Sequence, residues 1–189
     1  MPDKNSLRNQ ILQKRAALSP DILEKSRETS AQLLFQSEEY ARANTVMVYM
    51  DFRSEVPTGM IIDQILASGK KLVLPLTDSA FHIIPYEMPK EGNLSDYLTT
   101  SKYGIAEPDP ALCKEADRAS IDLVVIPGSV FDRNQNRIGY GKGCYDQFLP
   151  TLSKNVVKLA LAYDFQVLPS IPSSPTDVKM DRILVIPTE

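Results

Sequence analysis

The chain has 189 residues, 43% hydrophobic and 24% charged, a composition that excludes a disordered or fibrous protein. Its formal net charge of -3 and pI near 5.3 argue against a general nucleic-acid binder, because such domains carry a basic excess. Cys113 and Cys144 are too few cysteines for a disulfide framework or a four-ligand zinc site. No secretory segment or run of about 20 apolar residues appears. We therefore expect one domain over residues 1–189 in the reducing cytoplasm, with no nucleic acid or membrane as partner.

Two predicted helices open the chain. Apolar residues recur at helical spacing over residues 4–18, which indicates an amphipathic helix. Ser19 and Pro20 then supply an N-cap and a first-turn proline for a second helix, which we expect to end near Ser37.

Strands and helices alternate in the rest of the chain. Residues 45–50 are typical of a buried strand, residues 58–69 of a helix capped by Thr58 and closed by Gly69, and residues 71–75 of the next strand. Further strands are predicted at 81–86, 121–128, 156–164 and 182–187, and a further helix at 144–152. This order predicts an α/β fold: a three-layer α/β/α sandwich with a mainly parallel or mixed central sheet, and with ligands outside the carboxyl ends of its strands.

A segment of alternating glycines is the strongest sign of a binding site. In RNQNRIGYGKGCYDQF, residues 133–148, glycines occupy positions 139, 141 and 143, accompanied by the cations Arg137 and Lys142. We call residues 139–143 the glycine strip. Without Cβ atoms, its backbone N–H groups can approach a phosphate closely, and the two cations add charge. The pattern favours a phosphate-bearing ligand over a turn with no chemical role.

Two common phosphate-binding motifs do not fit this segment. A P-loop requires a Lys-Ser/Thr pair after its last glycine, where this chain has Cys144. Asp164 lies where the ribose-binding acid of a dinucleotide fold is expected, but the third glycine of that fingerprint falls on Cys144. Gly139 also lies well beyond Pro127, where the preceding strand is expected to end. We therefore exclude a Walker site and dinucleotide binding.

The sequence closely resembles the 5-formyltetrahydrofolate cyclo-ligases, also called methenyltetrahydrofolate synthetases. DLVVIPGSVFDRNQNRIGYGKGCYDQFL is similar to their signature D-L-x-x-x-P-G-x-x-F-D followed by R-[LI]-G-x-G-x-G-Y-Y-D. The resemblance covers nearly the whole chain. Its other motifs are K-x-x-L-R at Lys4–Arg8, E-V-x-T at Glu55–Thr58, G-I-x-E-P at Gly104–Pro108, and TDVKMD around Asp177.

The resemblance implies an ATP- and Mg²⁺-dependent conversion of 5-formyltetrahydrofolate to 5,10-methenyltetrahydrofolate, with release of ADP and phosphate. The formyl oxygen takes the γ-phosphoryl group, N10 attacks the activated carbon, and phosphate leaves as the ring closes. No enzyme nucleophile is required, so the protein contributes positioning and charge stabilisation. The implied partners are ATP and a reduced formyl folate, and we expect a monomer.

The resemblance also implies residue roles on the ATP side. Lys4 and Arg8 are one helical turn apart, share a helix face and should point at the phosphates; a solvated basic face is the alternative. Asp146 and Asp177 should hold Mg²⁺, although Asp146 alone is equally typical of a first-turn helix residue. The implied ATP-binding residues are Lys4, Arg8, Arg137, Gly139, Tyr140, Gly141, Lys142, Gly143, Cys144 and Tyr145, of which Arg137, Lys142 and Tyr145 are implied as catalytic and Lys142 as the contact to the γ-phosphoryl group.

On the folate side, Glu55 follows the first strand and should hydrogen-bond the N–H-rich edge of the pterin. Met50 is expected to form an apolar wall, with Phe52 and Tyr103 as weaker candidates, because each alone is also typical of a core residue. The implied substrate-binding residues are Met50, Glu55, Tyr140, Gly141, Lys142, Gly143 and Cys144.

Three positions depart from the family pattern: Cys144 replaces a tyrosine, Gln135 a glycine and Thr176 a histidine. Cys144 beside a helix N-terminus and Lys142 suggests a reactive thiolate, but the single histidine, His82, lies in an apolar strand pattern and is a poor general base. Two other functions stay open at this point. One is an α/β enzyme acting on a sugar phosphate or CoA ester, and the other is a non-catalytic folate-binding homologue.

Overall fold

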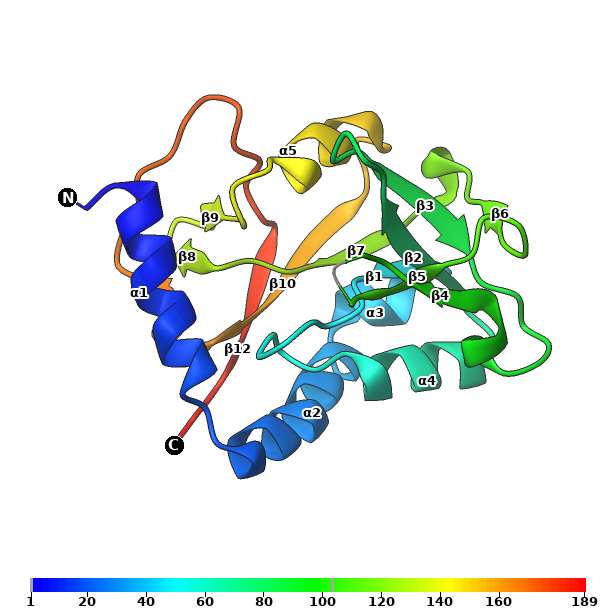
Figure 1. Cartoon of the computed structure of the whole chain (residues 1–189), viewed down its shortest axis with the longest axis horizontal. Coiled ribbons are helices and arrows are strands. Elements are labelled where there is room, and N and C mark those ends of the chain that lie inside the picture. The colour runs from blue at the N-terminus through cyan, green and yellow to red at the C-terminus, as the bar shows by residue number, and fades with distance from the viewer. Residues whose placement is uncertain (1, 103) are drawn as a thin grey trace.

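The computed structural model describes residues 2–102 and 104–189 and is built around a seven-stranded sheet with the order β12-β10-β7-β1-β2-β3-β6 (Figure 1). The strands from β12 to β2 run parallel, and β3 and β6 join antiparallel at one edge. A mixed, mainly parallel sheet is therefore confirmed. Its strands are β1 (Thr45–Val48), β2 (Lys71–Thr77), β3 (Ile83–Glu87), β6 (Lys114–Glu115), β7 (Leu123–Ile126), β10 (Val157–Tyr163) and β12 (Arg182–Ile186).

Helices cover both faces of this sheet. α2 and α4 lie on one side and α5 on the other (Figure 1). The two N-terminal helices are present as predicted, and Asp3 and Ser19 cap them by accepting bonds from Ser6 N (2.9 Å) and Ile22 N (3.3 Å). The helices are α1 (Lys4–Ala16), α2 (Pro20–Phe35), α3 (Glu38–Arg42), α4 (Gly59–Ala67) and α5 (Cys144–Phe148), with single 3₁₀ turns at Leu94–Tyr97, Arg118–Ser120, Leu149–Thr151 and Asp164–Gln166.

The alternation of side chains along β1 shows why the sheet is buried on both faces. Val46 and Val48 pack with Ile62 of α4 in one apolar cluster, whereas Met47 between them packs with Phe148 of α5 in the other. Successive residues of a strand point to opposite faces, so a run of apolar residues needs a covering layer on each side. The two clusters account for the three layers.

A second, smaller sheet supports α1. It has the order β11-β8-β9 and consists of Val167–Leu168, Val130–Asp132 and Arg137–Ile138. Leu7 and Ile11 of α1 pack against Val130 and Ile138 of this sheet in a third apolar cluster. The polar face of α1 is thereby held beside the segment that follows β9, which is the glycine strip. A separate hairpin pairs β4 (Leu98–Thr100) with β5 (Ala106–Pro108).

Several local expectations were wrong. Thr58 makes no side-chain cap to α4, because its hydroxyl instead donates to the carbonyl oxygen of Tyr49 at 2.8 Å. The helix from Cys144 is α-helical only to Phe148 and then narrows to a 3₁₀ turn that contains Pro150, which has no N–H to continue the helix. α3 and the strands β4, β5, β6, β8, β9 and β11 were not anticipated. Across residues 2–102 and 104–189, no helix has the length and apolar character needed to span a membrane.

Candidate active site

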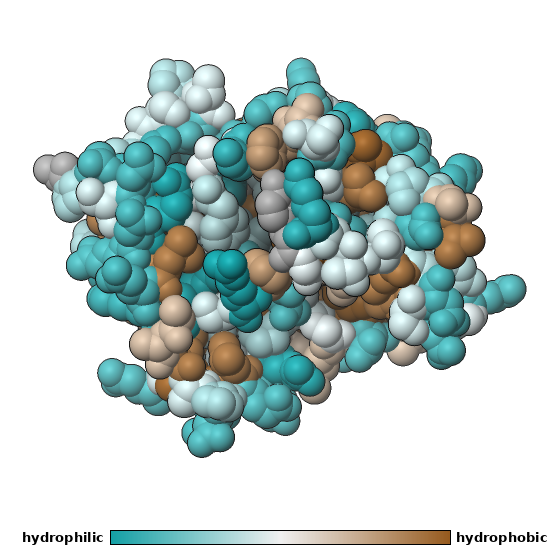
Figure 2. All heavy atoms as spheres, viewed as in Figure 1, coloured by the Kyte–Doolittle hydropathy of each residue, from teal (hydrophilic) through white to brown (hydrophobic). Residues whose placement is uncertain are grey.

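The predicted site residues gather at the carboxyl ends of β1 and β7. The loop after β1 carries Glu55, and the segment after β7 carries Arg137 and the glycine strip. Carboxyl ends of neighbouring parallel strands open onto the same edge of a sheet, where α/β proteins bind ligands. In the space-filling view the surface over α1 is mainly hydrophilic, and the face toward the viewer is hollowed beside that helix (Figure 2).

The glycine strip needs its glycines for backbone conformation and for close approach. Gly141 and Gly143 have φ values of +98° and +70°, in the left-handed region that other residues rarely adopt. A Cβ atom at Gly141 would lie 3.4 Å from the Cζ atom of Arg8. Nε of Arg8 donates a hydrogen bond to the carbonyl oxygen of Gly139 at 2.8 Å. The strip is therefore bare backbone with a guanidinium from α1 resting on it.

Arg137 is a buried cation at the base of the strip. Its Nη2 pairs with Oδ2 of Asp146 at 3.1 Å, and its Nη1 donates to the carbonyl oxygen of Pro127 at 3.3 Å. The guanidinium lies 5.6 Å from the ring centroid of Tyr145. Nε of Arg137 is buried and has no hydrogen-bond partner among residues 2–102 and 104–189. An unpaired N–H of a buried guanidinium is costly, and a phosphate oxygen is a partner that would satisfy it.

The two expected metal ligands are connected through the backbone of the residue that follows Asp177. Oδ1 of Asp146 accepts a hydrogen bond from the amide of Val178, the residue directly after Asp177, at 3.1 Å. Asp177 forms an ion pair with Lys4 and accepts from the amide of Ser174 at 2.7 Å. Burial alone would raise the pKa of Asp177, but Lys4 and Ser174 outweigh it and hold that pKa below its usual value. The ionised form of the Asp177 carboxylate is thus favoured, and Asp146 lies close to it through the contact with Val178.

This pair of carboxylates suits a hard divalent cation that is shared with a substrate. Among the described residues, no three His, Cys, Asp or Glu side chains gather into a metal cage. Mg²⁺ is commonly held by one or two carboxylates together with water and substrate phosphates. Asp146 and Asp177 therefore fit Mg²⁺ better than a metal that needs a full set of protein ligands.

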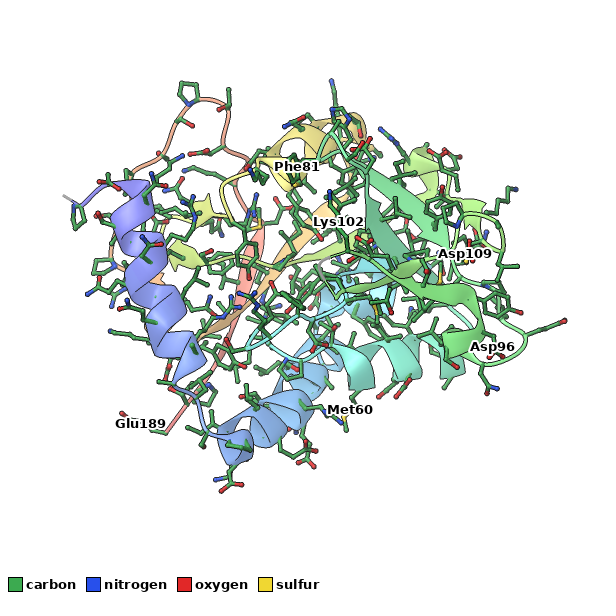
Figure 3. The ribbon with its side chains drawn as sticks, in the orientation of Figure 1. Met60, Phe81, Asp96, Lys102, Asp109 and Glu189 are labelled. Carbon is green, nitrogen blue, oxygen red and sulfur yellow. The ribbon has the colours of Figure 1, made fainter. Side chains whose placement is uncertain are left out.

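Lys142 extends from the strip toward the β2–β3 turn. Its Nζ lies 4.6 Å from the ring centroid of Phe81, and Figure 3 shows Phe81 beside α5. Phe81 has φ +66°, a left-handed conformation that is strained for a bulky residue. Phe81 could not be predicted as a neighbour of Lys142, because it lies in a turn between two strands and the contact is entirely tertiary.

Glu55 is the buried carboxylate of the site. Its side chain belongs to a residue that is 9% exposed, and it accepts hydrogen bonds from the Tyr140 hydroxyl at Oε1 and from the amide of Phe52 at Oε2 (2.9 Å). Burial raises the pKa of Glu55 above its usual value, although these two donors oppose the rise. Tyr140 leaves 44% of its surface exposed, but burial of its hydroxyl and the charge of Glu55 raise the pKa of the phenol.

The expected apolar wall is only partly beside Glu55. Met50 is half-buried and packs against the main cluster of the sheet. Phe52 is half-buried, with the guanidinium of Arg53 at 5.0 Å from its ring centroid. Tyr103 lies outside the described residues. The structure thus places Met50 and Phe52 on the loop that holds Glu55.

Sequence reasoning missed Arg15, which the structure places between the strip and Glu55. Arg15 is 4% exposed, and its Nη1 donates to the hydroxyl of Tyr140 at 2.7 Å. Its position, seven residues after Arg8, put it on the same face of α1 as Lys4 and Arg8, and this spacing was a signal that the sequence offered. Gln166 was also missed. Its Nε2 donates to the carbonyl oxygens of Gly128 (3.0 Å) and Ser129 (2.9 Å).

The structure argues against the other roles considered for Cys144, His82 and Asp164. Burial raises the pKa of the half-buried Cys144 thiol above its usual value despite Arg137 and Lys142, which is the reverse of what a reactive thiolate requires. His82 lies on an exposed turn before β3, not within a strand, and contacts Asp78 at 3.3 Å. The Asp164 carboxylate accepts hydrogen bonds from the hydroxyl of Thr188 at 2.8 Å and from the amide of Thr188 at 3.2 Å. Asp164 therefore has a structural role.

The departure at Gln135 has a conformational meaning. Gln135 adopts φ +66°, where glycine is favoured, in the turn that connects β8 and β9. Its side-chain Nε2 donates to the carbonyl oxygen of Asp181 at 3.0 Å. The position at which the family pattern has glycine is therefore one where the backbone is left-handed in this chain.

Similar solved structures have the same fold. A 5,10-methenyltetrahydrofolate synthetase from Mycoplasma pneumoniae superimposes with a TM-score of 0.72 at 26% identity, covering 96% of this chain and 98% of that one. The 5,10-methenyltetrahydrofolate synthetase of Aquifex aeolicus gives a TM-score of 0.83 at 27% identity, covering 96% and 89%.

Sequence comparisons agree over the same length. The chain is 29% identical to a probable 5-formyltetrahydrofolate cyclo-ligase of Schizosaccharomyces pombe and 27% identical to the 5-formyltetrahydrofolate cyclo-ligase of Mus musculus. Both alignments cover 96% of this chain, with 94% and 92% of the relatives. The model of the 5-formyltetrahydrofolate cyclo-ligase family matches residues 1–186. A match of that extent, on a fold that gathers the motif residues at one edge of the sheet, shows that this chain belongs to the 5-formyltetrahydrofolate cyclo-ligase family.

Proposed function

We propose that this chain is an ATP- and Mg²⁺-dependent 5-formyltetrahydrofolate cyclo-ligase that forms 5,10-methenyltetrahydrofolate and releases ADP and phosphate. The observation that carries the proposal is that neighbouring residues of the glycine strip contact both α1 and Glu55: Gly139 accepts a hydrogen bond from Arg8, and Tyr140 donates one to the buried carboxylate of Glu55. This arrangement supports a phosphate site and a folate site that meet at Tyr140.

On the nucleotide side, the strip offers backbone N–H groups and three arginine and lysine side chains offer charge. Arg8 rests on Gly139, Arg137 is buried with an unpaired Nε, and Lys142 is exposed at the far end of the strip. A partly buried guanidinium interacts with phosphate more strongly than an exposed one, because less water screens it. We assign Arg137 and the strip to the triphosphate and Lys142 to the transferring γ-phosphoryl group, with Lys4, Cys144 and Tyr145 as further ATP contacts.

Asp146 and Asp177 are the residues that would hold Mg²⁺. Their present partners, Arg137 and Lys4, also belong to the proposed phosphate site. Bound there, Mg²⁺ supplies neutralisation of charge on phosphate oxygens. Binding of the metal nucleotide would therefore replace contacts of two existing ion pairs, Arg137–Asp146 and Lys4–Asp177.

On the folate side, Glu55 is the assigned contact to the pterin. Tyr140 and the amide of Phe52 use one site on each carboxylate oxygen, and the remaining lone pairs can accept N–H groups of the ring. Met50, on the same loop, supplies an apolar contact, and the strip from Tyr140 to Cys144 forms the boundary with the nucleotide. Cys144 is smaller than the tyrosine of the family pattern, so this boundary has less aromatic surface for stacking.

The proposed reaction requires positioning more than covalent help from the protein. The formyl oxygen attacks the γ-phosphorus and ADP leaves. N10 then attacks the formyl carbon and loses its proton, and the C–O bond to phosphate breaks as the ring closes. Because the described geometry places no activated nucleophile in the site, and the Cys144 thiol has a raised pKa, the cations that stabilise phosphate charge are the main catalytic contribution.

The experiment that tests the proposal follows methenyl formation by absorbance, with ATP and Mg²⁺ each omitted in turn and ADP measured in parallel. We expect a chromophore only in the complete mixture, with one ADP for each ring closed. Tight binding of 5-formyltetrahydrofolate without ADP release would instead establish a non-catalytic homologue. ADP release with a sugar phosphate or a CoA ester would establish another activity.

Four wider expectations concern the domain, the substrates, the oligomeric state and the location. The whole of residues 1–189 acts as one domain, which is supported by a sheet that joins β1 near the start of the chain to β12 near its end. The substrates are small molecules, ATP and a reduced formyl folate. A monomeric state and a cytoplasmic location stay predictions.

A further inference from the structure

Arg15 is a buried cation that the proposed chemistry has not yet used. Its Nη1 donates to the Tyr140 hydroxyl at 2.7 Å and lies 3.5 Å from the carbonyl oxygen of Gly128. Nε of Arg15 is buried without a hydrogen-bond partner in the part of the chain that the structure describes. Burying a guanidinium with an incomplete set of partners is unfavourable for folding. Packing of α1 alone therefore does not explain why an arginine lies here.

The contact with Tyr140 determines where the hydroxyl hydrogen points. A phenol has one hydrogen to donate, whereas a guanidinium can only donate. Because Arg15 occupies the oxygen of Tyr140 as a donor, the Tyr140 hydrogen is directed to another acceptor, and that acceptor is Oε1 of Glu55. The guanidinium also lies 5.7 Å from the ring centroid of Tyr140, which holds the ring itself. Arg15 thus sets the direction of the bond that Glu55 receives.

Glu55 is fixed from both sides as a result. Its other oxygen accepts from the amide of Phe52, and the Tyr163 hydroxyl donates to its backbone carbonyl at 3.3 Å. Arg15, Glu55 and Tyr140 line one crevice together with Tyr49 and Pro127. A hydrogen-bonded chain of this kind polarises each member and orients the last acceptor.

We propose that Arg15 is a positioning residue for the folate pocket, which acts through Tyr140 to orient the Glu55 carboxylate. This inference rests on the proposed folate contact of Glu55. Arg15 makes no contact with the reacting atoms; its effect is on the geometry in which Glu55 accepts the N–H groups of the substrate. Because Tyr140 lies within the glycine strip, the same chain ties the folate contact to the nucleotide side of the site.

The test compares Arg15→Met, Arg15→Lys, Tyr140→Phe and the Arg15→Met/Tyr140→Phe double variant. Lys14→Met is the matched control, because Lys14 is the exposed neighbour on the same helix. Steady-state kinetics gives KM for each substrate, and equilibrium titration of 5-formyltetrahydrofolate without ATP gives its Kd. We expect Arg15→Met and Tyr140→Phe each to raise the folate KM and Kd roughly tenfold, and Arg15→Met to change kcat and the ATP KM by less than about twofold.

Two further results are expected. Arg15→Lys, still a donor, should restore most of the folate affinity, and the double variant should bind folate no more weakly than the weaker single variant. Three outcomes would overturn the inference. The losses of folate affinity in Arg15→Met and Tyr140→Phe could multiply in the double variant, Arg15→Met could lose ATP affinity as much as folate affinity, or Tyr140→Phe could bind folate more tightly. If Arg15→Met does not fold by circular dichroism, Arg15→Lys and Tyr140→Phe decide the question. Absence of methenyl formation by the unmodified protein would instead defeat the proposed function.

Discussion

Lys4 and Asp177, which are 173 positions apart in the chain, form an ion pair that joins the first turn of α1 to the segment before β12. Ser174 strengthens the contact, since its hydroxyl lies 3.4 Å from Nζ of Lys4 and its amide donates to the same carboxylate. The two ends of the chain are thus joined at the candidate phosphate site. Binding of a metal nucleotide would give each member of the pair a new partner.

The first prediction concerns the requirement for Mg²⁺. Replacing Asp177 or Asp146 by Asn removes a charged ligand, so the Mg²⁺ concentration for half-maximal activity should rise by about tenfold or more. The measurement is initial rate against Mg²⁺ concentration at saturating ATP. Asp63→Asn, at an exposed position of α4, is the control and should leave the curve in place. An unchanged curve for both Asp146→Asn and Asp177→Asn would remove this pair as the metal site.

The second prediction concerns Lys142. Its Nζ lies over the Phe81 ring and forms no ion pair or hydrogen bond with residues 2–102 and 104–189, so Lys142→Ala should leave the fold intact. Loss of a charge that stabilises the transferring phosphoryl group should lower kcat by about 100-fold and raise the ATP KM. Lys25→Ala, at an exposed position of α2, provides the comparison. Kinetics indistinguishable from those of the unmodified protein would place Lys142 outside the site.

The third prediction concerns the left-handed residue Gln135. Gln135→Gly should increase the free energy of unfolding by about 0.5–1 kcal/mol, because relief of the φ +66° conformation exceeds the loss of one exposed hydrogen bond. Gln135→Ala loses the same bond without relieving the backbone and should be less stable than the original chain. Urea unfolding with an unchanged m-value measures both. Equal destabilisation by Gly and Ala would show that the side-chain bond dominates.

The fourth prediction concerns acid stability and Asp132, which is 0% exposed. Burial would raise the pKa of Asp132, but the side chain and amide of Asn136, with the amides of Ile171 and Asn134, outweigh it and lower that pKa. The ionised carboxylate therefore stabilises the fold above the unfolded-state pKa of about 3.9, and this stabilisation is lost as the pH falls through the lower folded-state pKa.

Asp132→Asn tests this assignment. It should cost about 2–4 kcal/mol at pH 7, because an amide cannot accept the same set of donors, and it should flatten the fall in stability below about pH 4. Part of the acid dependence should persist, since the pKa of Asp177 is also lowered. The measurement is urea unfolding across a pH series. A variant with the full acid dependence of the original chain would contradict the role given to Asp132.

The sheet and the bare backbone of the glycine strip were predictable because their signals are local. An apolar run such as residues 123–126 predicts a strand that is buried on both faces. Glycines at alternate positions predict a backbone that a ligand can approach closely. Arg15 and Phe81 were not found, since the importance of each depends on a partner more than 60 residues away, Tyr140 and Lys142 respectively. β8 and β9 are too short for a period of two to be recognised, and their apolar residues Val130 and Ile138 pack against α1, which is distant in the sequence.

The attachment of α1 has a consequence for inactivation. The helix supplies Lys4, Arg8 and Arg15, yet its two buried apolar side chains, Leu7 and Ile11, belong to the small third cluster and not to the two that hold the main sheet. Detaching it exposes little apolar surface compared with melting the sheet, so this opening is the less costly event. On heating, the enzyme should lose its activity at a temperature at which the central sheet is still folded.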